Sequence, residues 1–173
     1  MILITTSRRP TRRVRSFCKD LERVIPGAVK VNRGKKNIYE VLAEAAQRNL
    51  PYAVVVETWK GNPGNMLFYR ADIAGAREPL AIFRIKGVKL QREFGKKRIE
   101  KVSEIKVLRN ERCPELTDFL SKVLGSSETG EEQEKKVILE VDTKNGENVM
   151  IFRIDGEEVG PRIRFRVLRM GGI

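Results

Sequence analysis

The 173-residue sequence contains no histidine, and its only cysteines are Cys18 and Cys113. The missing histidine excludes Ser–His and Cys–His catalysis, zinc sites that use imidazole, and acid–base chemistry by that side chain. The two cysteines lie far apart and in no metal-binding spacing. We therefore interpret both as buried thiols in a reducing compartment, and we expect no metal.

Long apolar runs and catalytic motifs are also missing. No run approaches the ~20 residues of a membrane-spanning helix, and no secretory signal pattern opens the chain. There is no Walker pattern, and no G-x-G-x-x-G follows a predicted strand. No pair of carboxylates lies in a setting that would shift a pKa. We therefore expect a cytoplasmic protein that is not an enzyme and that uses neither a cofactor nor a membrane.

Basic residues are abundant and unevenly distributed, with a net charge of +12. Residues 1–36 contain eleven lysines or arginines and two acidic residues, and residues 84–109 contain ten and three. Residues 110–160, in contrast, contain six basic and thirteen acidic residues. Such clustering is typical of the basic patches with which folded proteins bind nucleic acids. The alternative is a set of solvated basic faces.

The first fifteen residues, MILITTSRRPTRRVR, predict a short strand, a hydroxyl-rich turn and a helix over 11–25, with Pro10 in its first turn. Free N–H groups at a helix start favour an anion, and here they lie among arginines. The alternative is an ordinary helix cap with a solvated face. The predicted phosphate-binding residues are Ser7, Arg8, Arg9, Arg12 and Arg13.

A second unit of the same type follows. Residues 28–31 predict a strand, residues 32–36 a basic loop, and residues 38–49 a helix that Asn37 and Glu40 cap. If the two strands are parallel, both basic loops lie at the same edge of the sheet, where α/β proteins bind ligands. We therefore add Arg33, Lys35 and Lys36 to the predicted anion site.

The remaining chain predicts the order helix, strand, strand, strand twice. After helix 38–49 the predicted strands are 53–57, 66–70 and 79–85, with a turn over 59–65. After strand 102–108 come helix 114–124, an acidic loop over 126–134, and strands 136–143, 148–154 and 159–168. This pattern predicts an α/β protein of two similar halves with mixed sheets. Trp59 could stack on a base, although one Trp beside a strand end is more often a core or rim residue.

The last predicted strand carries a second basic signal. Ile163, Phe165 and Val167 alternate with Arg162, Arg164 and Arg166, so the three arginines point to one face. Alternate residues of a strand are ~6.6–6.8 Å apart, a spacing suited to following a nucleic-acid strand. The alternative is an exposed edge strand whose charges prevent pairing with another sheet.

Three segments resemble the Brix-domain proteins of ribosome biogenesis. Residues 4–10 (ITTSRRP) are similar to the family's T-S-R-x-P opening, residues 31–34 (VNRG) to its N-R-G segment, and residues 159–162 (VGPR) to its closing I-G-P-R motif. They occur in the family's order and span nearly the whole chain. The best match is the compact archaeal form, related to the family member that works with the U3 small nucleolar RNA in small-subunit processing.

The resemblance implies a single Brix domain over 1–173, with halves of roughly 1–90 and 91–173. It implies that the first half resembles the anticodon-binding domain of class II aminoacyl-tRNA synthetases. It also implies a non-enzymatic RNA-binding factor in pre-rRNA processing and ribosomal subunit assembly. The sequence leaves the oligomeric state open, and a protein that is monomeric outside the particle is the simplest expectation. Its partners would be pre-rRNA or a guide-type small RNA, and ribosomal or other assembly proteins. An RNA-modifying or RNA-cleaving enzyme and a protein-only scaffold remain the alternatives.

Overall fold

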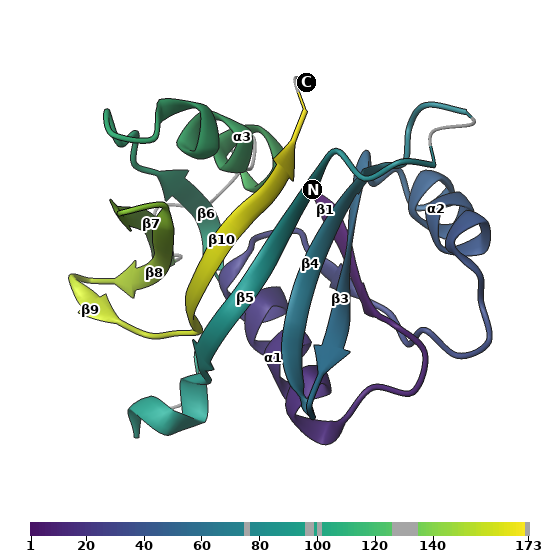
Figure 1. The fold of residues 1–173 in the computed structure, drawn as a ribbon, viewed down its shortest axis with the longest axis horizontal. Helices are drawn as coiled ribbons and strands as arrows, with labels where there is room; N and C mark the ends of the chain where they lie inside the picture. Colours follow the sequence, from purple (N-terminus) through teal and green to yellow (C-terminus); the bar gives the residue numbers. More distant parts are fainter. Residues whose placement is uncertain (75–76, 96–98, 100–101, 126–134, 172–173) are drawn as a thin grey trace.

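The computed structural model describes residues 1–74, 77–95, 99, 102–125 and 135–171, and these residues form an α/β fold (Figure 1). The elements follow the order β1 (Ile2–Thr6), α1 (Arg12–Val24), β2 (Val29–Lys30), α2 (Ile38–Gln47), β3 (Tyr52–Trp59), β4 (Asn62–Arg70), β5 (Ala81–Lys89), the 3-10 helix η1 (Gln91–Phe94), β6 (Val102–Val107), α3 (Pro114–Leu124), β7 (Lys135–Lys144), β8 (Glu147–Ile154), β9 (Glu157–Glu158) and β10 (Arg162–Met170). The predicted α/β class is confirmed. The predicted acidic loop over 126–134 lies outside the described residues.

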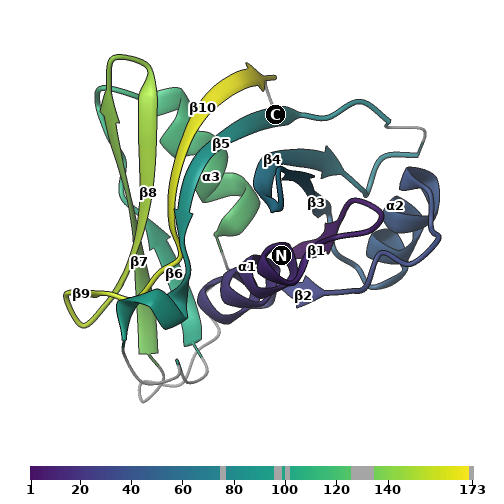
Figure 2. The same ribbon diagram turned by 60° about the horizontal axis from the view of Figure 1, so that its bottom comes forward.

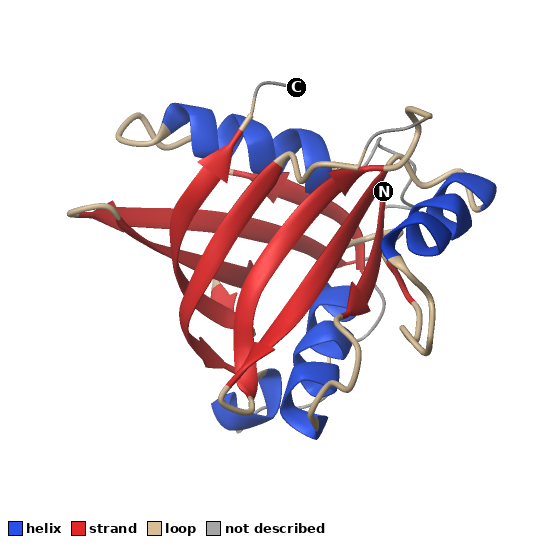
Figure 3. Cartoon of the chain, turned by 45° about the vertical axis from the view of Figure 1, so that its right-hand side comes forward, coloured by secondary structure: helices blue, strands red, loops and turns tan. Residues whose placement is uncertain are grey.

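The strands form one continuous, curled sheet (Figure 3) in the order β2-β1-β3-β4-β5-β10-β8-β7-β6, with β9 paired to β8. Strand β1 runs parallel to β2 and β3, and β6 runs parallel to β7, while the other pairs are antiparallel. The sequence predicted mixed sheets in two halves. The structure joins them into one because β10 pairs with β5 along its whole length.

The sheet has similar strand orders on the two sides of the β5–β10 pair. One side follows the order β1, β3, β4, β5 from its edge inward, and the other follows the order β6, β7, β8, β10. This symmetry fits the doubled sequence pattern, and the division into two halves stays a prediction. The helices differ from that pattern. Helices α1 and α3 lie inside the curve of the sheet and α2 lies outside it (Figure 2).

The direction of the strand crossovers explains the position of α2. The chain moves from β1 to β2 on one side, and then from β2 past β1 to β3 on the other side. Right-handed crossovers in opposite directions place their helices on opposite faces of a sheet. Helix α3 therefore corresponds to α1, because both cover the inner face of the sheet. The predicted repeat of helix, strand, strand, strand had paired α3 with α2 instead.

The main core lies between the inner face of the sheet and helices α1 and α3. Its centre is a cluster of four phenylalanines from β4, β5, β10 and α3. Phe83 stacks on Phe165 with ring centroids 4.8 Å apart and lies 4.9 Å from Phe68, and Phe119 meets Phe68 edge-on at 5.4 Å. This cluster binds the strands on both sides of the β5–β10 junction into one core.

Some local predictions need correction. Helix α1 begins at Arg12 with Thr11 as its N-cap, so Pro10 precedes the cap and is not in the first turn. The turn after β3 is shorter than predicted, because only Lys60 and Gly61 have positive φ angles and β4 begins at Asn62. Such a two-residue turn matches the twist of the paired strands.

The two cysteine side chains lie in different environments. Cys18 is buried, as predicted, and burial raises the pKa of its thiol to about 12. Cys113 is only half-buried at the start of α3, so the prediction of a second fully buried thiol is wrong. Both cysteines are free thiols.

Candidate nucleic-acid interface

The two predicted basic loops meet at the same edge of the sheet, which confirms the prediction based on parallel strands. The Arg33 guanidinium donates to the Thr6 carbonyl oxygen at 3.0 Å, and Arg8 donates to the Lys35 carbonyl oxygen at 3.5 Å. We call this group of residues the loop cluster. It consists of Ser7, Arg8, Arg9, Arg12, Arg33, Lys35 and Lys36.

Exposure differs within the loop cluster. The side chains of Arg9 and Arg12 are exposed and make no ion pair with any described residue. Arg9 has a φ of 58°, a left-handed conformation that is uncommon outside glycine, as the chain turns from β1 to α1. Lys36 is bonded to the Asn32 carbonyl oxygen at 3.0 Å and paired with Glu44 at 3.1 Å. Its charge is therefore partly compensated within the protein.

Arg33 is half-buried and holds the cluster together. Besides its bond to Thr6, its Nε donates to the Lys36 carbonyl oxygen at 2.7 Å. Burial lowers the pKa of Arg33, and the neighbouring charge of Arg8 lowers it further. We infer that Arg33 positions the second loop against the end of β1.

Replacement of Arg33 tests this positioning role. We expect Arg33→Ala to lower the free energy of unfolding by about 1–3 kcal/mol, because two hydrogen bonds from a charged donor are lost. Arg33→Lys should recover little of this loss, since a lysine cannot form the same fork. Urea denaturation measures both effects, with the exposed Arg8→Ala as the control. Equal stability of Arg33→Ala and the unmodified protein would contradict the role.

Arg13 makes its contacts within the protein, and its role in anion binding stays a prediction. Its guanidinium lies 2.9 Å from a Glu93 carboxylate oxygen and donates to the Val88 carbonyl oxygen at 2.9 Å. The Leu90 N–H and Arg13 both lower the pKa of Glu93. Arg13 therefore ties α1 to the end of β5.

The arginine row of β10 has the predicted alternation, with Ile163 and Phe165 buried and the three arginines exposed. The edge-strand alternative is wrong for residues 163–165, which pair with both β5 and β8, whereas the strand from Arg166 onward pairs with β5 alone among the described strands. Arg162 forms a two-pronged bond with Glu158 at 2.6 and 2.7 Å. Arg164 approaches Glu147 at 3.6 Å. Arg166 has no ion-pair partner in the described part of the chain.

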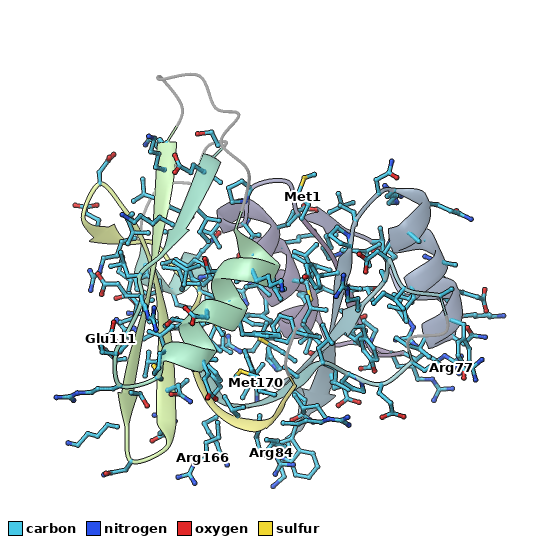
Figure 4. All side chains as sticks on the ribbon, turned by 90° about the horizontal axis from the view of Figure 1, so that it is seen from above. Met1, Arg77, Arg84, Glu111, Arg166 and Met170 are labelled. Atoms are coloured by element: carbon cyan, nitrogen blue, oxygen red, sulfur yellow. The ribbon has the colours of Figure 1, made fainter. Side chains whose placement is uncertain are left out.

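Sequence reasoning missed two basic residues of β5, Arg84 and Lys86. Both are exposed, and Arg84 is directly opposite Arg166 in the β5–β10 register. Figure 4 shows Arg84 and Arg166 projecting from the same side of the molecule. Like charges at opposed positions of a sheet destabilise it, so this pair favours a bound anion. The alternation of Arg84 and Lys86 with buried Phe83 and Ile85 was the available signal.

A hollow of about 430 Å³ connects the loop cluster to these strands. Ser7 lines one side of it and Arg84 and Lys86 line another, and a second hollow of about 410 Å³ runs from Ser7 to Arg8 and Arg33. Four strand spacings of ~4.8 Å separate β1 from β10. The basic side chains on this face of the sheet therefore extend over roughly 19 Å across the strands. We call the loop cluster, Arg84, Lys86, Arg164 and Arg166 together the outer basic surface.

Trp59 lies on the rim of the first hollow and is 68% exposed, so it is not a core residue. The Lys60 ammonium lies 5.6 Å from the centre of its ring. Gly64 allows this arrangement, because a Cβ atom there would lie 2.5 Å from the Trp59 Cβ. The ring is therefore held at the surface beside the basic side chains.

The described ranges contain no group of three or more Cys, Asp or Glu side chains that could hold a metal ion. None of the described helices is long and apolar enough to cross a membrane.

No family model matches the chain. A protein of Pyrococcus horikoshii named probable Brix domain-containing ribosomal biogenesis protein is 47% identical over 104 residues, 60% of this chain and 46% of that protein. A protein of the same name from Methanopyrus kandleri is 35% identical over 127 residues, 70% of this chain and 65% of its own. The chain thus spans about half the length of the first curated relatives that it matches.

Two solved structures share the fold. The crystal structure of a probable ribosomal biogenesis protein from Aeropyrum pernix is 32% identical, with a TM-score of 0.78 over 95% of this chain and 94% of that one. The structure of Mil, an archaeal Imp4-like protein, is 24% identical, with a TM-score of 0.64 over 95% and 96% of the two chains. The predicted likeness of the first half to an anticodon-binding domain stays a prediction.

Proposed function

We propose that this chain, which belongs to the family of Brix domain-containing ribosomal biogenesis proteins, is an RNA-binding factor in pre-rRNA processing and ribosomal subunit assembly. The assembly role comes from the names of its relatives. The RNA-binding role rests on one observation of this chain. Two basic segments more than a hundred residues apart in sequence lie on one continuous surface, because β10 pairs with β5 and the hollow reaches Ser7.

Lysine and arginine contacts to phosphates supply most of the affinity, through the release of counterions. Selection among RNAs comes from shape and from unpaired bases, since side chains do not read the deep groove of an RNA helix. The RNA is a ribosomal precursor or a guide-type small RNA, and protein partners are those of an assembling particle. In this proposal the protein is cytoplasmic, is monomeric outside the particle and performs no catalysis.

Crosslinking in native cells, with sequencing of the RNA and of the crosslinked peptides, tests the proposal. We expect precursor ribosomal RNA attached to peptides from residues 1–36, 82–88 and 159–169. Crosslinks to tRNA alone would contradict the assembly role, and an absence of RNA crosslinks would favour the protein-only scaffold. Incubation of structured RNA with the protein and magnesium should leave the RNA uncut, and specific cleavage would favour the enzyme alternative.

A further inference from the structure

The hollow beside Ser7 has a lining more varied than phosphate binding alone requires. It lies on the outer face where β3 turns into β4. Figure 1 shows this turn at the lower end of the two strands. Its lining includes Glu57, Thr58, Trp59, Asn65, Arg84 and Lys86. Its volume of about 430 Å³ lies within the range of small-molecule sites. The lining therefore combines an aromatic ring, polar acceptors and cations.

Two polar atoms of this lining lack a partner. Thr58 Oγ1 and Asn65 Oδ1 are shielded from solvent and accept no hydrogen bond from any described residue. The orientation of the Asn65 amide is set by its nitrogen, which donates to Glu57 Oε1 at 3.1 Å. A shielded amide oxygen without a donor and a shielded hydroxyl without a partner are energetically costly, so they favour a ligand that offers the amide oxygen an N–H group and the hydroxyl an acceptor. Flexible side chains around them must shift to admit it.

The other walls fit the remaining parts of a nucleotide. The exposed ring of Trp59 offers a flat apolar face on which a base can stack. Arg84 and Lys86 supply positive charge for the phosphate on the side of the hollow nearest β10. A stacking ring, N–H acceptors and cations in one hollow match the three chemical parts of a nucleotide.

We infer that this hollow binds one unpaired guanine nucleotide of the RNA, an inference that rests on the proposed function and extends it. Asn65 Oδ1 and the Glu57 carboxylate are acceptors only, so they select a base edge with adjacent N–H donors. Guanine presents N1–H and N2–H₂ side by side, and its O6 can accept from the Thr58 hydroxyl. Adenine and uracil each place an acceptor where guanine places one of these donors.

The inference is testable by fluorescence, because Trp59 is the single tryptophan of the chain. The probes are single-stranded RNA hexamers of uridine in which one central base is guanine, adenine or cytosine. We expect the guanine hexamer to quench Trp59 and to bind about tenfold more tightly than the others, the size typical of specific base contacts. Glu57→Gln and Asn65→Leu should each remove most of that preference.

Filter binding with Trp59 variants separates the contribution of base stacking to the affinity from the contribution of charge. Trp59→Ala should weaken binding of the guanine hexamer about tenfold, while Trp59→Phe should retain most of it. Tyr39→Ala, which removes another exposed aromatic side chain on α2, is the matched control and should change nothing. Equal, salt-dependent binding of all hexamers without quenching would overturn the guanine site and leave the proposed RNA binding intact. No binding of any RNA would overturn both.

Discussion

Phe83→Ala lowers the free energy of unfolding by about 3–5 kcal/mol, the largest effect on stability that we expect from one substitution. The Phe83 side chain is fully buried and contacts the rings of Phe68, Phe119 and Phe165. Its removal takes a large apolar side chain out of the core and leaves a cavity that rigid strands cannot close. It also deletes ring–ring contacts, each worth about 0.5–1.5 kcal/mol beyond burial.

Urea denaturation followed by circular dichroism and by Trp59 fluorescence measures this effect. Trp59 reports on β3 and β4, whereas circular dichroism reports on all strands and helices. We expect one transition with coincident midpoints in the unmodified protein, because the phenylalanine cluster spans the β5–β10 junction. The exposed Tyr39→Ala should shift the stability by no more than ~0.5 kcal/mol. A loss below ~1 kcal/mol in Phe83→Ala, or two separate transitions, would contradict a shared core.

Simultaneous replacement of Arg8, Arg12 and Lys35 by glutamine weakens RNA binding by roughly ten- to a hundredfold at moderate salt. All three side chains are exposed members of the loop cluster. Each phosphate contact to a single strand contributes about 0.7 to the slope of log affinity against log salt concentration, so the slope should fall by about 2. Arg33 is left unchanged, because its replacement would disturb the loop itself.

A matched triple variant tests whether RNA binding depends on the position of the replaced charges or only on the net charge of the protein. Lys106 on β6, Arg112 in the loop before α3 and Lys122 on α3 are also exposed. Their replacement by glutamine removes the same three charges, and we expect it to change the affinity and the salt slope much less. Filter binding at several salt concentrations gives both quantities. Equal losses in the two triple variants would show that the net charge of +12, and not the loop cluster, controls binding.

Short-range features of this protein follow directly from the sequence. The capping box of Asn37 and Glu40 marks the start of α2, and both of its bonds are present. The alternation of β10 places the Arg164 and Arg166 side chains on the exposed face. The meeting of the two basic loops also follows, because two parallel strand–loop–helix units share an edge. Each of these features depends on residues within about thirty positions of one another, where capping, alternation and short crossovers decide the structure.

The tertiary structure alone decided how distant segments meet. The pairing of β5 with β10 places Arg84 opposite Arg166, and the pairing of β1 with β3 brings Ser7 to the hollow that Glu57 and Arg84 line. The contact between Arg13 and Glu93, eighty positions apart in sequence, compensates part of the Arg13 charge within the protein. A charged side chain at a loop or on a strand has the same local pattern whether it meets solvent, a carboxylate or another cation. Its partner is set by strand order and register, which the burial of the whole core determines.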